Sequence, residues 1–231
     1  RTLHTYYSLA LFTLLFLVFF PLFLIPIVFP KQFHLVGVLN RIWAKVLFPL
    51  AFIPYKVECR SRLDQEKQYI FCPNHFSYLY IPVMGFNPIN AIFVGKNDME
   101  NIPLFGFMYR KLHITVDRAN LKSRVNTILR SKKALDDGKS LMIFPEGGII
   151  TKKPPHMAHF KDGAFRIAIE KQIPIVPVTI PHNWIILPDH QLMRLHRGIV
   201  KVIFHEPIET KTYNLEKIDD LKKKVFDIVN T

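Results

Sequence analysis

The sequence predicts an α/β fold in which a mixed central sheet is flanked by helices, with an N-terminal membrane-associated helical hairpin. From residue 54 onward, short segments of strand character alternate with helical segments, a pattern typical of α/β domains. Residues 1–53 are apolar almost throughout, and no Asp or Glu occurs before Glu58. We therefore divide the chain into a membrane-anchoring hairpin, residues 1–53, and an α/β domain, residues 54–231.

The formal net charge of +13 indicates an anionic partner, which can be a nucleic acid, an anionic lipid or an anionic substrate. Nucleic-acid-binding proteins place their basic residues among polar residues and exposed aromatic residues. Here the positive charge accompanies a very apolar N-terminus. The charge pattern therefore predicts membrane lipids as partners and no nucleic acid.

Only two cysteines occur, Cys59 and Cys72, and both are expected on neighbouring strands. A disulfide bridge between them is one interpretation. Two reduced thiols packed in the core are the preferred one, which places the domain on the cytoplasmic side of a membrane. No group of Cys and His residues has the spacing of a metal site, so we predict no metal.

The N-terminal segment from Leu3 to Pro30 contains no formally charged residue. Its length suits a membrane-spanning helix, which needs about 20 apolar residues, but three prolines are expected to interrupt it: Pro21, Pro26 and Pro30. A second apolar stretch follows, from Phe33 to Ile53. We interpret the segment as helix, proline break and helix.

Two such helices within one leaflet would place four basic residues at the lipid head groups: Lys31, Arg41, Lys45 and Lys56. A single spanning anchor is the close alternative. A buried core hairpin is a weaker one. A cleaved signal peptide is disfavoured, because the run lacks a small-residue cleavage site and more apolar helix follows it.

Strands are predicted where apolar residues alternate or form short runs, at residues 55–60, 68–72, 91–94, 114–116, 140–144, 175–180 and 199–204. Helices are predicted at residues 77–86, 103–111, 121–135, 164–170 and 215–229. Pro103 suits the start of its helix, and Gly138 suits the end of another. The helix at 121–135 is expected to gather five apolar residues near one face: Leu121, Val125, Ile128, Leu129 and Leu135.

Polar residues follow three of the predicted strands: Asn74-His75, Asp117-Arg118 and Glu146-Gly147-Gly148. Strand ends are where α/β proteins place their functional sites, and glycines allow a backbone to approach a ligand closely. Taken singly, each loop also suits a structural interpretation: a buried histidine, a local ion pair and a turn. Their order along the chain is the stronger signal.

Four blocks in this order resemble those of the lysophosphatidate and glycerolphosphate acyltransferases, the family that forms phosphatidate. The blocks are residues 74–80, 114–118, 144–147 and 175–178, with Lys96 and residues 102–106 between the first two. The resemblance implies that residues 54–231 are an acyltransferase catalytic domain. It implies transfer of a fatty acyl group from a thioester of coenzyme A or acyl-carrier protein to the hydroxyl of lysophosphatidate, with no cofactor.

The resemblance also assigns roles to residues. His75 is the general base, since imidazole titrates near working pH. Lys96 and Arg118 bind the acceptor's head group, although a solvated surface lysine is the alternative for Lys96. Glu146 holds a glycerol hydroxyl or orients Arg118. The remaining roles are oxyanion stabilisation by the backbone at Gly147 and Gly148, substrate binding by Lys161, and motif architecture at Asn74, Ser77, Pro145 and Pro177. His113, His156 and His159 are expected to be surface or loop residues without a catalytic role.

Two positions depart from the family pattern. The first block is Asn-His-x-Ser-x-x-Asp in the family, and Tyr80 occupies the acidic position. Tyrosine is neutral near pH 7 and cannot offset an imidazolium, so we predict impaired activity. A substitution in an otherwise intact block is the favoured explanation; a natural inactive form and replacement by another acid are the alternatives.

The second departure is Ile149, where the family places an Arg that helps bind the acceptor phosphate. Lys152 and Lys153 are nearby candidates to replace it. Alternatively, the acceptor lacks a phosphate, as a lyso-aminolipid does. A catalytically silent membrane protein that binds lipid or acyl-carrier protein is the competing functional hypothesis, and Tyr80 is the feature that supports it.

Overall fold

The computed structural model describes residues 1–117, 119–151, 153–189 and 194–230. Its strands are β1 (Tyr55–Cys59), β2 (Ile70–Pro73), β3 (Ala91–Lys96), β4 (Ile114–Val116), β5 (Ser140–Ile143), β6 (Ile175–Thr179) and β7 (Val200–Phe204). Its helices are α1 (Thr2–Val28), α2 (His34–Leu50), α3 (Tyr80–Val83), α4 (Phe105–Leu112), α5 (Leu121–Asp136), α6 (Gly163–Lys171), α7 (Asn183–Ile186) and α8 (Ile218–Val229). Every strand and helix predicted after residue 54 is present, β4 with the predicted ends and the others with shifted ends, whereas α7 was not predicted.

The strands form a mixed sheet in the order β1-β7-β6-β2-β5-β3-β4. Only the β6–β7 pair is antiparallel among the described strands, and the other neighbouring pairs are parallel. The carboxyl ends of β2, β3, β4, β5 and β6 therefore meet at one edge of the sheet. This is the edge at which an α/β protein can gather loops into a site.

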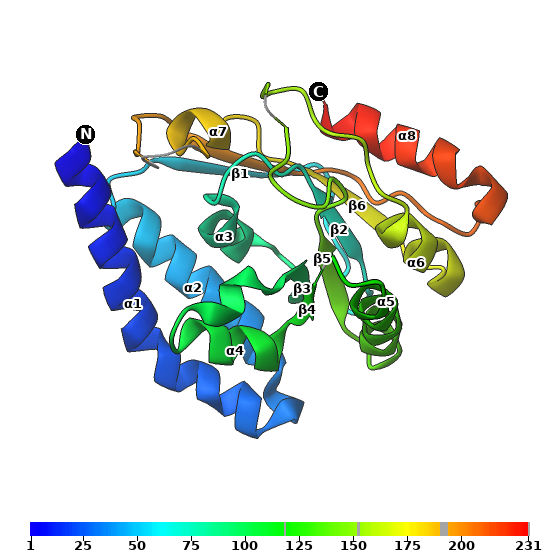
Figure 1. Ribbon diagram of the computed structural model, residues 1–231, viewed down its shortest axis with the longest axis horizontal. Coiled ribbons are helices and arrows are strands. Elements are labelled where there is room, and N and C mark those ends of the chain that lie inside the picture. The colour runs from blue at the N-terminus through cyan, green and yellow to red at the C-terminus, as the bar shows by residue number, and fades with distance from the viewer. Residues whose placement is uncertain (118, 152, 190–193, 231) are drawn as a thin grey trace.

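Two layers of helices cover the sheet, because side chains alternate between its faces along each strand. Phe71 packs toward α2 and α3, in a core with Phe48, Val83 and Phe204. Its neighbours Ile70 and Cys72 pack toward α5, α6 and α8 on the opposite face. Figure 1 shows α2 and α3 on one side of the sheet and α5, α6 and α8 on the other. The prediction of a helix-flanked mixed sheet is confirmed.

Helix α1 continues through two of the prolines that were expected to break it. It runs from Thr2 to Val28 with Pro21 and Pro26 inside it, and the chain turns at the short 3-10 helix η1 (Pro30–Gln32). A proline inside a helix removes one hydrogen bond and bends the helix. That loss is local, and the apolar turns on either side still pack against α2 and α4. The predicted break is therefore correct only at Pro30.

Helix α1 exposes most of its apolar surface. Leu9, Leu14 and Val18 are 61%, 59% and 59% exposed. Only 11% of the most apolar 18-residue stretch of the helix is buried. With about 1.5 Å of rise per residue, its 27 residues are long enough to cross a bilayer. A core helix would bury this surface, so the buried-hairpin alternative does not describe α1.

Helix α2 packs against α1 on one side and the α/β domain on the other, and this placement corrects the role expected for Arg41. The Arg41 guanidinium donates to the carbonyl oxygens of Asn87 at 3.2 Å and Pro88 at 3.4 Å. Arg41 therefore fastens α2 to the domain instead of facing lipid head groups. Lys45, one turn further along α2, is exposed.

The two cysteines do not lie on neighbouring strands, because β7 and β6 separate β1 from β2. Both thiols are free; Cys72 is buried in the core, but Cys59 is exposed on the edge strand. The predicted packing of reduced thiols in the core therefore applies to Cys72 alone. Burial raises the pKa of the Cys72 thiol well above its usual range, which keeps it protonated.

Helix α5 buries only part of the face that its apolar residues predicted, since Leu135 is buried and Ile128 packs against the core. Leu121, Val125 and Leu129 are 65%, 51% and 59% exposed, while the buried positions are mostly small: Thr127, Ser131, Ala134 and Leu135. Small side chains let α5 lie close to the strands, and the Thr127 hydroxyl donates to Ser123 within the helix. Close approach to the sheet therefore decides which face is buried.

Candidate active site

His75 lies two residues after the end of β2, and its position is fixed by hydrogen bonds of Asn74 that link two strand ends. The Asn74 side-chain amide donates to the carbonyl oxygen of Ile180 at 3.1 Å, and its Oδ1 accepts from the Ile180 backbone N–H at 2.7 Å. These paired bonds tie the end of β2 to the end of β6. Because Asn74 is buried, its polar atoms need such partners. The two hydrogen bonds therefore fix the backbone position of the next residue, His75.

Ser77 secures the turn that leads from His75 into α3. Its hydroxyl donates to the carbonyl oxygen of Leu187 at 2.5 Å and accepts from the Leu79 backbone N–H at 3.1 Å. The side chain is completely buried. It therefore links the first block to the segment after α7. Pro177 lies beside Cys72 in the β6–β2 register, and the Pro145 carbonyl accepts from the Lys161 backbone N–H at 2.8 Å.

Glu146 is a fully buried carboxylate whose two oxygens both accept from backbone N–H groups. Oε1 accepts from His75 at 2.6 Å, and Oε2 accepts from Ala158 at 2.9 Å. The side chain therefore joins the loop after β5 to the backbone of His75 and to the loop before α6. This contact with His75 was not anticipated from the sequence.

Burial raises the pKa of Glu146 to about 7, although the hydrogen bonds from Ala158 and His75 oppose the shift. A carboxyl group with a raised folded-state pKa stabilises the fold below its unfolded pKa of 4.5, and this stabilisation is lost as the pH rises toward 7. We expect the free energy of unfolding to fall by about 3 kcal/mol over this range relative to a Glu146→Gln variant.

Chemical denaturation of both proteins from pH 4.5 to pH 7 measures this difference. Glu216→Gln, which changes an exposed glutamate, is the control and should follow the unsubstituted chain. If the free energy of unfolding depended on pH in the same way for the unsubstituted chain and for Glu146→Gln, the raised pKa of Glu146 would be contradicted.

The ring of Tyr80 packs directly on the imidazole of His75. The two ring centroids are 4.6 Å apart with an interplanar angle of 80°, and Phe144 contacts both rings, at 4.4 Å from His75 and 4.6 Å from Tyr80. Position 80 therefore brings its side chain to His75, as the motif spacing requires. It offers an aromatic ring there, whereas a carboxylate would stabilise an imidazolium.

An open cleft, which we call the His75 cleft, brings most of the predicted site residues together. His75, Tyr80, Lys96, Gly147, Gly148 and Lys161 all line it. Lys96 reaches the cleft from the end of β3, and Ile149, Ile150 and Asp189 contribute to the same wall. The cleft combines an imidazole with two ammonium groups, which suits an anionic ligand with a reacting hydroxyl.

Gly147 requires glycine for two reasons. Its φ of +81° lies in the left-handed region that L side chains rarely adopt. A Cβ atom at this position would also lie 2.7 Å from the Nζ atom of Lys161. The glycine therefore lets the Lys161 ammonium lie directly over the loop that follows β5.

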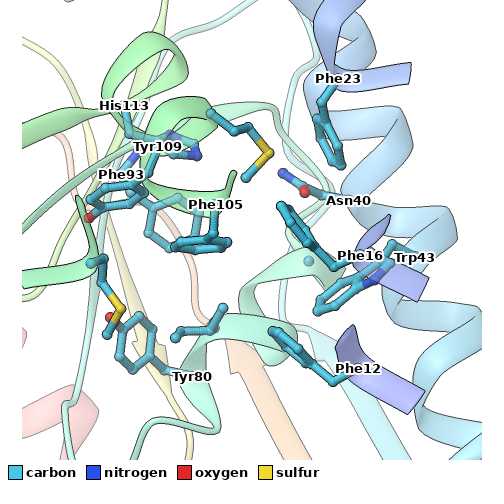
Figure 2. Close-up of a pocket in the computed structure, with 14 residues that line it drawn as sticks. Phe12, Phe16, Phe23, Asn40, Trp43, Tyr80, Phe93, Phe105, Tyr109 and His113 are labelled. Carbon is cyan, nitrogen blue, oxygen red and sulfur yellow. Dashed lines mark hydrogen bonds between the residues drawn. The ribbon is translucent and has the colours of Figure 1, made fainter. Parts of the chain in front are cut away.

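An apolar cavity adjoins the His75 cleft on the side of α1 and α2. Figure 2 shows aromatic side chains around it, with Phe12, Phe16 and Phe23 from α1 facing Phe105 and Tyr109 from α4. Tyr80, Phe93, Met99 and Tyr109 line both the cavity and the cleft. The N-terminal helices thus form a wall of the space that leads to His75.

His113 is buried at this cavity, which corrects its expected place on the surface. Its Nδ1 accepts from the Phe93 backbone N–H at 3.3 Å. Burial lowers the pKa of His113 to about 3, so the imidazole is neutral. His113 lies between α4 and β4, and in the sequence it is only a polar residue between a helix and a strand. His156 and His159 are exposed, as expected.

Two predicted site residues, Arg118 and Lys152, lie outside the described residues. Phe144 and Tyr109 are cleft residues that residue-by-residue reasoning missed. Phe144 stands inside the third block, next to Pro145, and that adjacency was the available signal. Tyr109 belongs to the helix predicted at residues 103–111, and no sequence pattern distinguishes it from an ordinary core tyrosine.

Comparison with known proteins agrees with this geometry. The family described as Acyltransferase matches residues 55–181. A 1-acyl-sn-glycerol-3-phosphate acyltransferase of Haemophilus influenzae is 30% identical over 84% of this chain and 80% of its own. A chloroplastic 1-acyl-sn-glycerol-3-phosphate acyltransferase of Brassica napus is 26% identical over 87% of this chain and 57% of its own.

The chain spans about half the length of the chloroplastic relatives from Brassica napus and Arabidopsis thaliana, 57% and 49%. The crystal structure of the 1-acyl-sn-glycerophosphate (LPA) acyltransferase PlsC from Thermotoga maritima has the same fold. It matches with a TM-score of 0.79 at 21% identity and covers 100% of this chain and 95% of that chain. The family match covers more than half of the chain and contains His75, Glu146 and Pro177. The chain belongs to the acyltransferase family.

Proposed function

We propose that this protein transfers a fatty acyl group from an acyl thioester to the hydroxyl of a lysolipid, with lysophosphatidate as the acceptor and phosphatidate as the product. The observation that carries the proposal is the adjacency of two spaces of different chemistry. The His75 cleft, with Lys96 and Lys161, and the apolar cavity share Tyr80 as a lining residue. An acyl donor has the same two parts, an apolar chain and a polar reacting end.

In this reaction His75 takes the proton from the acceptor hydroxyl as the oxygen attacks the thioester carbonyl carbon. The carbon–sulfur bond then breaks, and the leaving thiolate receives the proton from the imidazolium. The backbone at Gly147 and Gly148 stabilises the oxyanion that forms between these steps. No covalent bond to the enzyme is required, because the acceptor itself is the nucleophile.

Lys96 and Lys161 bind the acceptor phosphate from opposite walls of the His75 cleft, from the end of β3 and from the loop before α6. Their ammonium groups take the place of the Arg that the family has at position 149, where this chain has Ile149. An ammonium group pairs with phosphate as a point charge. Glu146 acts as a positioning residue, since its carboxylate holds the His75 backbone. The donor is a thioester of coenzyme A or of acyl-carrier protein.

The apolar face of α1 and the free thiol of buried Cys72 support a membrane-associated protein whose domain lies on the cytoplasmic side. Residues 1–53 then anchor the protein and residues 54–231 carry the chemistry. Because α1 also walls the apolar cavity, an acyl chain would enter from the membrane side.

An acceptor panel tests the proposal. The chain and its Tyr80→Asp form are incubated with acyl-coenzyme A or acyl-carrier protein and with either lysophosphatidate or lysophosphatidylethanolamine. We expect phosphatidate to be the main product detected by mass spectrometry, because two ammonium groups line the cleft. Transfer only to the aminolipid would contradict lysophosphatidate as acceptor, and no transfer by either form would contradict the enzymatic function.

A catalytically silent lipid-binding protein is the second candidate, and the packing of Tyr80 on His75 favours it. This candidate predicts that lysolipid binds to the chain while neither form transfers an acyl group. The same panel, with binding measured by equilibrium dialysis, distinguishes it from the enzyme.

A further inference from the structure

A second cleft lies beside the turn between α1 and α2, and we call it the basic cleft. Its wall includes Ile92 and Ile114, which stand near the amino ends of β3 and β4. Lys96, at the other end of β3, lines the His75 cleft. At about 3.3 Å per strand residue, the four steps from Ile92 to Lys96 separate the two by roughly 13 Å. The basic cleft is therefore distinct from the proposed acceptor site.

The basic cleft is strongly cationic. Four basic side chains line it: Lys111, Arg130, Lys133 and Lys139. Asp137 is the single acid among its described lining residues, so the balance is three net positive charges. Like charges gathered around one space repel each other, and an anion within the space relieves that repulsion.

The cations of the basic cleft are held in ways that leave donors for a ligand. The Lys139 ammonium lies 4.7 Å from the centre of the Phe33 ring, which orients it without using its N–H groups. One Arg130 nitrogen faces the carbonyl oxygen of His113 at 3.5 Å, and a guanidinium has five N–H donors. The Lys133 Nζ is 3.5 Å from the Asp137 Oδ1 on an exposed surface, a weak pair.

The opposite wall of the basic cleft is apolar and belongs to the end of α1. Pro26, Ile27 and Pro30 line it, and the adjacent Val28 and Phe29 are 64% and 61% exposed. A free phosphate would use only the basic side chains. A molecule with a phosphate and long apolar chains would use both walls, and basic pockets beside membrane helices bind such head groups.

We propose that the basic cleft binds the phosphate head group of an anionic phospholipid whose acyl chains lie along the C-terminal end of α1. The phosphate pairs with Arg130 and Lys139, and the chains contact Val28 and Phe29. The bound lipid sets how the protein is seated on a membrane and is not consumed. The site affects membrane binding alone. This proposal therefore does not depend on whether the protein transfers acyl groups.

Vesicle partition of the full chain tests the proposal. Binding is measured to vesicles of phosphatidylcholine alone and to vesicles that contain phosphatidylglycerol as about one third of the lipid. We expect Arg130→Gln combined with Lys139→Gln to weaken binding to the anionic vesicles roughly 30-fold, since each basic residue near an anionic surface contributes about a factor of five. Binding to phosphatidylcholine should remain unchanged, because α1 is intact.

Lys211→Gln combined with Lys224→Gln is the matched control, since it removes the same charge from exposed positions outside the cleft. We expect this control to retain most of the preference for anionic vesicles. If both double variants lost anionic-vesicle binding equally, or if the cleft variant lost none, the proposed lipid site would be overturned. Lys111→Gln combined with Lys139→Gln is the second cleft variant, and thermal unfolding checks that each protein is folded.

Inorganic phosphate distinguishes a lipid site from a free-phosphate site. It is added to the vesicle assay and compared with chloride at the same ionic strength, which keeps electrostatic screening equal. We expect phosphate to have no greater effect than chloride, because the lipid also uses the apolar wall. Loss of the anionic preference in phosphate alone would overturn the lipid assignment.

Discussion

Replacing Tyr80 with Asp is expected to raise acyl transfer by about 10³-fold or more. In serine proteases, neutralising the aspartate beside the catalytic histidine costs about 10⁴-fold in kcat, because the imidazolium loses its charge partner and its correct tautomer. The Tyr80 ring already contacts the imidazole at 4.6 Å. A carboxylate at position 80 would therefore stand beside His75 without a change in the backbone.

The matched control for this prediction is Tyr80→Asn, which has the shape of Asp without its charge. Tyr80 lines both the His75 cleft and the apolar cavity, so either substitution also removes a ring that borders both spaces. A gain that appears with Asp and not with Asn assigns the effect to charge. Equal gains would assign it to the removal of the ring, and no gain with Asp would contradict the assignment of His75 as the base.

Replacing His75 with Gln in the Tyr80→Asp protein is expected to remove the gained activity, with a loss of 10²- to 10⁴-fold in kcat, typical of a general base. The fold should survive, because Glu146 accepts from the backbone N–H of residue 75 and the hydrogen bonds of Asn74 do not involve the imidazole. Initial rates with saturating acyl donor and acceptor measure the effect.

The control for this prediction is His159→Gln, which changes an exposed histidine in the loop before α6 and should leave the rate unchanged. The two substitutions at positions 75 and 80 should also be strongly non-additive. With Tyr80 in place, His75→Gln should cost little, since an imidazole without a carboxylate at position 80 is a weaker base catalyst. A full-size loss from His75→Gln in both backgrounds would show that the base works without a partner at position 80.

Local patterns predicted the strands and helices after residue 54, because alternation and proline positions act over a few residues. For α5 they predicted only part of the buried face. Leu121, Val125 and Leu129 of α5 are exposed because the small residues on the adjacent face approach the sheet. They also mislocated Cys59, since strand order is set by long-range pairing that inserts β7 and β6 between β1 and β2.

The candidate site divides in the same way. Motif order and spacing selected His75, Tyr80, Lys96, Gly147 and Lys161, and the structure places all of them at one cleft. The hydrogen-bond partners of Glu146 could not be predicted from the motif. Its carboxylate accepts from the backbone N–H groups of His75 and Ala158, which lie outside the block that contains Glu146. Backbone groups carry no sequence identity, so no residue pattern reports such a contact.

The sequence by itself determined the α/β architecture, the apolar N-terminus and the presence of Tyr80 where the family has an acid, since each depends on local composition or motif spacing. Only the tertiary structure decided that α1 runs unbroken past Pro21 and Pro26, that Arg41 faces the domain, and that His113 is buried. The physical reason is that packing against distant segments offsets local costs, such as a lost helical hydrogen bond or a desolvated imidazole. Those segments meet only in the folded chain.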